Sequence, residues 1–336
     1  MALIKDIDFG VKPSWPLSGH FIFMTLNIQK NILLASYTTF KIGGPAKYFS
    51  EAKNIEEIQE LCKWAREKKL PVFVLGGGSN VLISDKGFNG LVIKIENCKL
   101  RIKNSSVYAD AGVPLAKLII ESANAGLAGL EWAIGIPGTI GGAVCGNSGA
   151  YGRSISEVVI SGKAINPDGE IIEFSKNDCN FCYRGSIFKE KNNKLIIIEV
   201  EIGLTKSNSV VIIEKMKEII AERAKKIPPF PSAGSFFKNY KLPDDYKDSA
   251  LIKKFPELAK KIRSGKIATG YLIEQRGLKG VKVGGAMIAN EHTNFIVNAG
   301  GATAQDVLAL AEMCRKKVKE KYGLHLEIEK RLIGFD

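Results

Sequence analysis

The stretch VFVLGGGSNVLISD, Val72 to Asp85, decides the fold that the sequence predicts. Two apolar runs flank three glycines, Ser79 and Asn80, a pattern that indicates strand, tight loop and strand. Consecutive glycines can turn successive N–H groups into one concavity, which is a geometry that holds a phosphate or pyrophosphate. The spacing differs from the GxGxxG dinucleotide fingerprint, and an ordinary glycine hairpin explains three glycines alone equally well.

A second glycine-rich stretch, GLEWAIGIPGTIGGAVCGNSGAYG, runs from Gly129 to Gly152. Its glycines are too many for any regular element, so we expect an irregular backbone. Such a backbone can lie flat against a planar ligand, with isoleucines supplying apolar contacts. A long surface loop is the alternative, although loops of more than about 15 residues in compact domains are usually functional.

A proline-rich linker and changes of pattern predict how the chain is organised. PPFP at 228–231 is the strongest linker signal. Asn54 followed by Glu57, and Thr303 followed by Asp306, are typical of helix N-termini. We expect, in order, a leader at 1–27 unrelated to the rest of the chain, a βαββ unit at 28–97, a second α+β unit at 98–227, and a third unit at 228–336 whose last strand spans 324–333.

Composition narrows the classes of function. The 336 residues carry a formal charge of +13, which implies attraction to anions such as nucleic acid, a membrane surface or a phosphorylated small molecule. The basic residues are dispersed, however, which favours a solvated surface over a nucleic-acid interface. Six cysteines and no secretory signal indicate a cytoplasmic protein with reduced thiols, and the lone CxxC at Cys179 and Cys182 predicts no metal site. No apolar run approaches the roughly 20 residues of a membrane span.

Six motifs, taken together, resemble the UDP-N-acetylenolpyruvoylglucosamine reductase family. The resemblance covers about Thr38 to Gly334, and any one motif would be weak, but six in order are highly specific. They are TTFKIGGPA, VLGGGSNVLISD, GIPGTIGGAVCGNSGAYG, CYRGSIF, AGSFFKN and LEIEKRLIG.

The resemblance implies an α+β fold. Its parts are an FAD-binding module of the vanillyl-alcohol-oxidase (PCMH) type, with subdomains at 28–97 and 98–227, and a C-terminal α+β substrate domain at 228–336. It also implies an oxidoreductase that holds FAD non-covalently, uses NADPH as co-substrate and makes UDP-N-acetylmuramate for peptidoglycan, the cell-wall polymer on which cell shape and division depend. We expect a monomer in the cytoplasm, without a nucleic-acid partner.

The resemblance also assigns roles to residues. Hydride from flavin N5 would reach the enolpyruvyl group, with Ser235 as the proton donor and with Arg184 and Glu329 stabilising the charge that develops. Arginine suits its role because its fork pairs bidentately with a carboxylate, whereas serine is a poor acid that needs help from its site. Tyr183, Lys226 and Asn239 would contact the UDP-sugar. The residues implied to hold FAD are Gly76, Gly77, Gly78, Ser79, Asn80, Ile134, Gly135, Pro137, Gly138, Gly142, Gly146 and Gly152.

The sequence departs from the family at two places. One branch of the family has a loop with a tyrosine lid after the strand that here ends at Leu204, but no tyrosine lies between Tyr183 and Tyr240, so the chain resembles the branch without that lid. The stretch 240–269 is also longer than that branch predicts. Its side chains, Tyr246 and Lys253 among them, are candidates to cover the substrate instead.

Two other functions stay open on the sequence. The first is another FAD-dependent oxidase or dehydrogenase of the same fold. Many such enzymes tether flavin through histidine, yet His20, His292 and His325 all lie outside the glycine-rich segments. The second, a basic nucleic-acid-binding protein, predicts salt-sensitive binding to DNA or RNA and no flavin. That interpretation leaves both glycine-rich segments unexplained.

Overall fold

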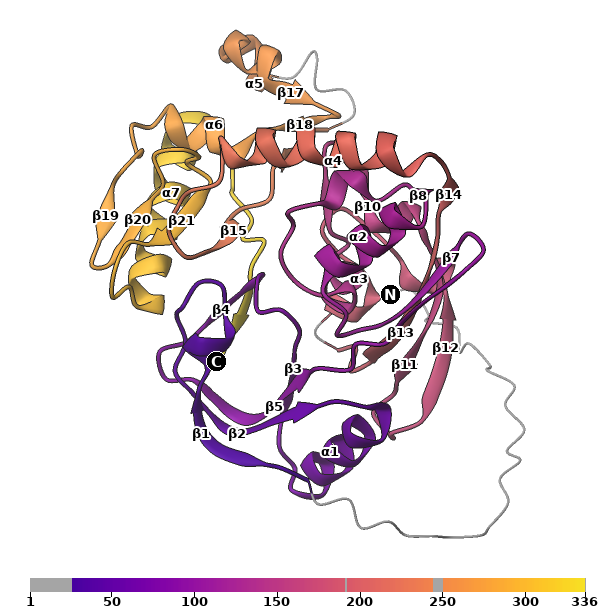
Figure 1. The fold of residues 1–336 in the computed structure, drawn as a ribbon. Coiled ribbons are helices and arrows are strands. Elements are labelled where there is room, and N and C mark those ends of the chain that lie inside the picture. Colours follow the sequence, from indigo (N-terminus) through magenta and orange to yellow (C-terminus); the bar gives the residue numbers. More distant parts are fainter. Residues whose placement is uncertain (1–25, 191, 244–249, 336) are drawn as a thin grey trace, which may run out of the picture.

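Three main sheets and their helices build the structure, which confirms the predicted α+β class (Figure 1). The computed structural model describes residues 26–190, 192–243 and 250–335. Almost all of the expected leader at 1–27 lies outside the described residues, and so does Tyr246, a candidate cover for the substrate.

The first sheet has the strand order β1-β2-β5-β3. Helix α1 (Ile55–Glu67) follows β2 and buries Ile58, Leu61 and Ala65. As predicted, Asn54 caps this helix, with its Oδ1 accepting a hydrogen bond of 2.8 Å from the Glu57 amide. The strands of this sheet are β1 (Gln29–Leu33), β2 (Pro45–Ala52), β3 (Val72–Leu75) and β5 (Phe88–Ile95).

The loop between β3 and β4 (Val81–Ile83) passes from one sheet to another. The prediction of strand, loop and strand is confirmed, but the glycine-hairpin interpretation is wrong. Strand β3 pairs in parallel with β5, whereas β4 pairs in parallel with β22 (Arg331–Ile333) near the end of the chain. The glycines therefore separate two sheets rather than join paired strands.

The second sheet is antiparallel, with the order β12-β11-β13-β7-β6. Helices α2 (Leu115–Asn124), α3 (Ile140–Cys145) and α4 (Ser209–Ala224) lie to one side of it in Figure 1. A single apolar core extends from the α1 face of the first sheet into these helices. The strands are β6 (Leu100–Lys103), β7 (Ser106–Asp110), β11 (Val159–Ile165), β12 (Ile171–Ser175) and β13 (Ile196–Gly203).

The second glycine-rich stretch is more regular than its composition predicts. It contains a 3-10 helix, Glu131–Ala133, and the short helix α3, so the expectation of no regular element is wrong. Thr139 caps α3 by accepting a hydrogen bond of 3.3 Å from the Gly142 amide. Close packing explains glycine inside this helix, because a Cβ on Gly141 would lie 2.8 Å from the Cβ of Ala111.

The third sheet has the order β15-β21-β20-β19 and packs against α7 (Ala304–Tyr322). Thr303 and Asp306 form the predicted capping box, and Gly323 ends α7 with φ +71°. The remaining elements of this part are β15 (Ser232–Ser235), β16 (Tyr240–Lys241), α5 (Ala250–Lys254), β17 (Ile262–Arg263), β18 (Lys266–Ile267), α6 (Thr269–Glu274), β19 (Lys282–Val283), β20 (Ala286–Ile288) and β21 (Phe295–Asn298).

The chain end runs from the third sheet to the separate two-stranded sheet formed by β22 and β4. The expected strand at 324–333 is wrong in length, because only Arg331–Ile333 is a strand. Before it, the chain makes isolated backbone bonds to the segment after β15: Lys238 N donates to Glu327 O, and Glu329 N donates to Phe236 O, each over 2.9 Å. The C-terminal segment bonds first to the residues after β15 and then, from Arg331, to β4, so it forms no continuous ladder with either.

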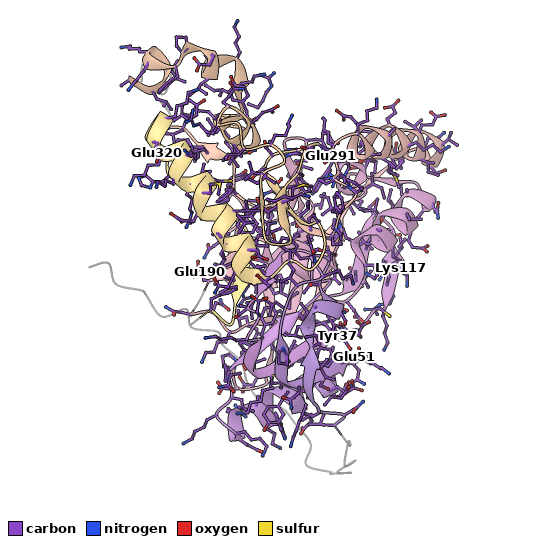
Figure 2. The ribbon with its side chains drawn as sticks, turned by 90° about the vertical axis from the view of Figure 1, so that its left-hand side faces the viewer. Tyr37, Glu51, Lys117, Glu190, Glu291 and Glu320 are labelled. Carbon is purple, nitrogen blue, oxygen red and sulfur yellow. The ribbon has the colours of Figure 1, made fainter. Side chains whose placement is uncertain are left out.

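Charged side chains such as those of Lys117 on α2 and Glu320 on α7 point into solvent (Figure 2). Among the described residues, no helix is both long enough and apolar enough to span a bilayer. Short strand pairs complete the fold: β8 (Leu127–Ala128) with β14 (Thr205–Lys206), and β9 (Gly149–Ala150) with β10 (Arg153–Ser154).

Candidate functional site

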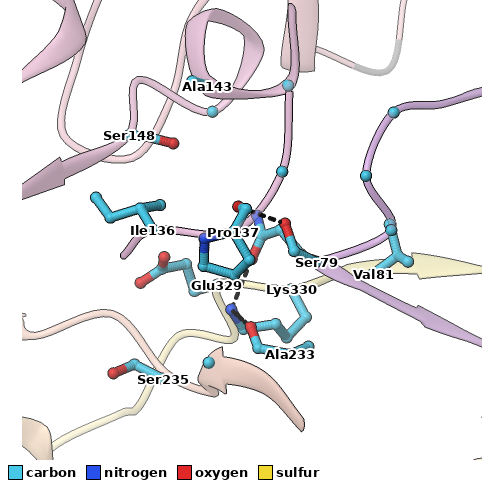
Figure 3. Close-up of a pocket in the computed structure, with 18 of the residues that line it drawn as sticks. Ser79, Val81, Ile136, Pro137, Ala143, Ser148, Ala233, Ser235, Glu329 and Lys330 are labelled. Carbon is cyan, nitrogen blue, oxygen red and sulfur yellow. Dashed lines mark hydrogen bonds between the residues drawn. The ribbon is translucent and has the colours of Figure 1, made fainter. Parts of the chain in front are cut away.

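A cavity of about 480 Å³ lies where the three sheets approach one another. Its walls come from the loop between β3 and β4, from α3 and the loops that flank it, from the end of α4, from β15 and from the C-terminal segment. Figure 3 shows Ser79, Ser148, Ser235 and Glu329 around this space. The cavity thus brings together segments that lie up to 250 positions apart in the chain, such as Asn80 and Lys330.

The two glycine-rich segments touch each other at one wall of the cavity. A Cβ on Gly77 would lie 2.6 Å from Gly138 Cα, and one on Gly78, whose φ is +63°, would lie 2.0 Å from the carbonyl oxygen of Tyr37. Ser79 Oγ joins the segments by donating to Pro137 O over 2.9 Å. Only glycine permits this approach of backbone to backbone, and it leaves the loop amides beside a ligand-sized space.

Most of the residues expected to hold a cofactor line this cavity. Ile134, Gly135 and Gly152 do not. Ile134 is buried in the main core, and Gly135 O accepts a hydrogen bond of 3.1 Å from Arg223. The expected residues that line the cavity are Gly76, Gly77, Gly78, Ser79, Asn80, Pro137, Gly138, Gly142 and Gly146.

Arg184 lies in a tight turn with a left-handed backbone, φ +59°. The turn is closed by two backbone hydrogen bonds between Cys182 and Gly185, and Asn147 holds it from outside by donating to Cys182 O over 2.8 Å. A non-glycine residue in this conformation costs of order 1 kcal/mol or more and is maintained only where the surroundings determine it. Here the turn directs Arg184 into the cavity.

Arg184 and Glu329 form an ion pair in the cavity wall, with Arg184 Nε 3.3 Å from Glu329 Oε1. Nε is buried and makes no hydrogen bond in the described part of the chain, so the pair is close but not bidentate. Lys189 supports both residues, because its Nζ donates to Arg184 O over 3.0 Å and to Glu329 O over 3.3 Å. Burial lowers the pKa of this lysine.

Ser235 ends β15 on the opposite side of the cavity from the Gly76–Asn80 loop (Figure 3). It pairs with Phe295 of β21 across an irregular register, and Gly234 before it has φ +82°. Within the described residues its hydroxyl makes no hydrogen bond. The structure thus brings Ser235, Arg184 and Glu329 to one cavity, as the sequence predicts.

The three residues expected to contact a substrate lie at or near the rim. Lys226 lines the cavity but is largely exposed and pairs with Glu222 at 3.3 Å. Tyr183 and Asn239 lie outside the lining and contact each other, since Asn239 N donates to Tyr183 Oη over 3.3 Å. Lys266 Nζ lies 4.7 Å from the centroid of the Tyr183 ring, so β18, from the unusually long stretch 240–269, reaches this rim.

Several basic residues of the cavity were missed by the sequence analysis. Lys330 is the most deeply buried of them. Side chains alternate along an extended segment, so Lys330 is expected on the face opposite Glu329 and therefore away from the site. Both faces of that segment are covered here, because it crosses between two sheets. The lysines and arginines that line the cavity are Arg184, Lys189, Arg223, Lys226, Lys330 and Arg331, whereas Glu329 is the one carboxylate among the described lining residues. The cavity therefore favours a ligand with several negative charges.

Comparisons with known proteins agree with the site. Two family models match the chain, the FAD binding domain at residues 46–175 and the UDP-N-acetylenolpyruvoylglucosamine reductase C-terminal domain at 224–333. A reductase of that name from Syntrophomonas wolfei is 39% identical over 310 residues, 91% of this chain and 95% of the relative. One from Lactobacillus helveticus is 37% identical over 311 residues, 92% of this chain and 96% of the relative.

A solved structure is also similar to the chain. The crystal structure of UDP-N-acetylenolpyruvylglucosamine reductase from Thermus caldophilus matches with a TM-score of 0.73 and 32% identity. The match covers 92% of this chain and 99% of that one. The similarity therefore extends over all three sheets rather than over the FAD-binding part alone.

Proposed function

Since the chain belongs to the UDP-N-acetylenolpyruvoylglucosamine reductase family, we propose that it reduces UDP-N-acetylenolpyruvoylglucosamine to UDP-N-acetylmuramate, with FAD as cofactor and NADPH as electron donor. One observation carries this proposal. A single cavity holds the glycine contact between two FAD-type segments, the Arg184–Glu329 pair and the Ser235 hydroxyl.

The residues of the cavity fit FAD. The loop Gly76–Asn80 presents backbone where side chains would collide with Gly138 and Tyr37, which suits a pyrophosphate. The segment around Pro137, Gly138 and Gly142 would face the flavin. Three of the predicted cofactor residues do not line the cavity, and their role in binding FAD stays a prediction: Ile134, Gly135 and Gly152.

The catalytic roles follow from the charge that the reaction develops. FAD, when bound and reduced by NADPH, would supply the hydride chemistry that acts on one carbon of the enolpyruvyl double bond. Negative charge then builds on the neighbouring carbon and the carboxylate, where Arg184 can stabilise it because its guanidinium is held in the wall of the cavity. Ser235 gives its proton to that carbon, and Glu329 keeps Arg184 oriented.

The UDP-sugar would extend from the reacting carbon toward the rim. Lys226 is the rim cation that we assign to the diphosphate, and Tyr183 and Asn239 would contact the sugar or nucleotide outside the cavity. NADPH, which is also polyanionic, would use the same cationic cleft before the UDP-sugar binds. The three sheets support the proposed division at about 97 and 227, with the first two units holding FAD and the third closing the substrate side.

The visible spectrum of the purified protein, loaded with FAD if necessary, tests the whole proposal. Flavin bands should bleach on anaerobic addition of NADPH and return on addition of UDP-N-acetylenolpyruvoylglucosamine. Bands that bleach and stay bleached would keep the cofactor and donor but reject this acceptor. Flavin that remains attached after denaturation would instead favour an oxidase with a covalent tether.

Ser235→Ala tests the assignment of the proton donor. Flavin reduction by NADPH should be nearly unchanged, whereas reoxidation by the UDP-sugar should slow by roughly three orders of magnitude or more, because only the second half-reaction needs the proton. Stopped-flow absorbance of the flavin follows both steps separately. An equal loss in the two half-reactions would contradict the assignment.

A further inference from the structure

Lys330 is a buried cation that forms no ion pair with a carboxylate in the described part of the chain. Its side chain is only 7% exposed, and among the described residues no carboxylate oxygen lies within 4 Å of its Nζ. Burial lowers its pKa from 10.5 to about 8 although the negative charge of Glu329 acts to raise it, and the positive charges of Arg184 and Lys189 add to the lowering. A methionine of similar length would avoid the cost of burying a charge, so packing alone does not explain a lysine here.

The hydrogen bonds of Lys330 join two parts of the proposed site. Its Nζ donates to Asn80 Oδ1 over 2.6 Å and to Ala233 O over 2.7 Å. Asn80 ends the glycine loop that we assign to FAD, and Ala233 lies two residues before Ser235 on β15. Figure 3 shows Lys330 reaching from the C-terminal segment to Ala233.

Thr39 joins the same two segments from another side. Its amide donates to Gly78 O over 3.1 Å, and its hydroxyl donates to Ser232 O over 2.7 Å. The loop Gly76–Asn80 and strand β15 are therefore connected twice, through Thr39 and through Lys330. The backbone adds a third link, because Arg331 N donates to Asn80 O while Glu329 N donates to Phe236 O.

We propose that Lys330, assisted by Thr39, is a positioning residue that couples the cofactor loop to the strand that carries Ser235. Ordering of the loop by FAD would fix Asn80, Lys330 would transmit that order to Ala233, and the Ser235 hydroxyl would then be held where the substrate carbon is protonated. The inference rests on the proposed function for the role of Ser235. The coupling itself requires only that FAD binds.

Hydrogen–deuterium exchange with and without saturating FAD tests this coupling. In the wild-type protein, FAD should slow exchange both in peptides covering 76–80 and in those covering 232–237. In Lys330→Met the protection at 76–80 should persist, while the protection at 232–237 should fall by at least about threefold, because the side-chain link is lost. Wild-type protein in which FAD protects 76–80 but not 232–237 would contradict the coupling.

Lys238→Met is the matched control. Lys238 follows the same strand and pairs with Glu327 of the same C-terminal segment, but it has no contact with the cofactor loop among the described residues. In Lys238→Met, the FAD-dependent protection at 232–237 should match that of the wild type. Thr39→Val keeps the side-chain shape but removes the hydroxyl bond to Ser232 O. It should lower the FAD-dependent protection at 232–237 as Lys330→Met does, and it is the variant to use if Lys330→Met does not fold.

Kinetics separate positioning from a general loss of structure. In Lys330→Met, reoxidation of the flavin at saturating UDP-sugar should slow roughly tenfold, and this loss should exceed any loss in flavin reduction at saturating NADPH by several-fold. Full protection at 232–237 in Lys330→Met, or an equal loss in Lys238→Met, would overturn the inference. Wild-type protein that shows the coupling but does not reduce the UDP-sugar would overturn the proposed function and leave the coupling in place.

Discussion

At the scale of single residues, Lys189 holds the two charged residues of the proposed active site together. Its ammonium bonds to the backbone carbonyls of Arg184 and Glu329, and Arg184 is kept in a left-handed conformation. We expect Lys189→Met to lower kcat roughly 10- to 100-fold, because small displacements of a catalytic group have effects of that size. Steady-state kinetics at saturating NADPH and UDP-sugar measure this loss.

A control separates this effect from the loss of any half-buried lysine. Lys94 is half-buried and pairs with Glu96 at the end of β5, outside the cavity. Lys94→Met should therefore keep kcat within about twofold of the wild-type value. If Lys189→Met behaved like Lys94→Met, the two carbonyl contacts would have no part in catalysis.

Lys330 makes a separate prediction for the pH dependence of stability. Its pKa is about 8 in the folded protein and 10.5 ordinarily, so between these values the unfolded chain binds a proton that the folded chain does not. The free energy of unfolding should therefore rise with pH in this window. From about pH 7 to about pH 10, wild type should gain about 2 kcal/mol relative to Lys330→Met.

Urea denaturation of the two apoproteins at both pH values measures this difference. Titrating groups distant from Lys330 are shared by the two proteins, so their contributions cancel in the comparison. A difference in unfolding free energy that stays constant with pH would mean that Lys330 has an ordinary pKa, and its burial would then be less costly than the structure implies.

At the scale of elements, the contact between the two glycine-rich segments depends on Gly77. A Cβ there would lie 2.6 Å from Gly138 Cα, and backbone cannot move aside as a flexible side chain can. Gly77→Ala should destabilise the apoprotein by about 2 kcal/mol and weaken FAD binding. Gly142→Ala is the control for stability alone, because Gly142 is helical and its Cβ would meet only Thr139 Oγ1 at 3.6 Å.

Thermal unfolding and FAD titration of these two variants measure the effects. Alanine at position 142 should leave the stability of the apoprotein unchanged or raise it, since alanine favours helix over glycine. Equal stability of the two variants would show that the segments can separate without cost, and that the glycines serve the ligand alone.

Local sequence signals predicted most of the elements and few of their partners. Caps such as Asn54 and Thr303 marked the helix ends correctly, and apolar runs marked β3 and β4. The pairing of β4 with β22 joins residues about 250 positions apart, and nothing local to either strand records it. Helix α3 was missed for a similar reason, since the glycine at position 141 is required by tertiary packing against Ala111, which is distant in sequence.

Part of the site was predicted from the sequence, and the prediction came from the family motifs rather than from the pattern of apolar and polar residues. Arg184, Ser235 and Glu329 meet in one cavity, although each alone has the sequence context of a surface residue. Lys189 and Lys330 were missed because a lysine is ordinarily exposed, and their burial depends on segments that cross from sheet to sheet. Only the tertiary fold brings these two lysines beside the residues that the motifs single out.

At the scale of the whole molecule, the fold concentrates positive charge around the cavity. The chain has a formal charge of +13, and six lysines and arginines line the cavity against the single carboxylate of Glu329 among its described lining residues. Elsewhere, basic side chains such as Lys117 are solvated on helix surfaces (Figure 2). This distribution indicates that part of the positive charge steers polyanionic ligands and that the rest only favours solubility.

Ionic strength distinguishes these two uses of the charge. Raising potassium chloride from about 20 mM to about 300 mM shortens the screening length from roughly 20 Å to roughly 6 Å, so kcat/KM for the UDP-sugar should fall several-fold. The value of kcat should change little, because ions inside the closed complex are screened less. Lys226→Met, which removes an exposed lining cation, should weaken this salt dependence, whereas Lys117→Met on α2 should leave it intact. A kcat/KM that is indifferent to salt in all three proteins would assign the charge to solubility alone, and the cations of the cavity would then act only by direct contact with the bound ligand.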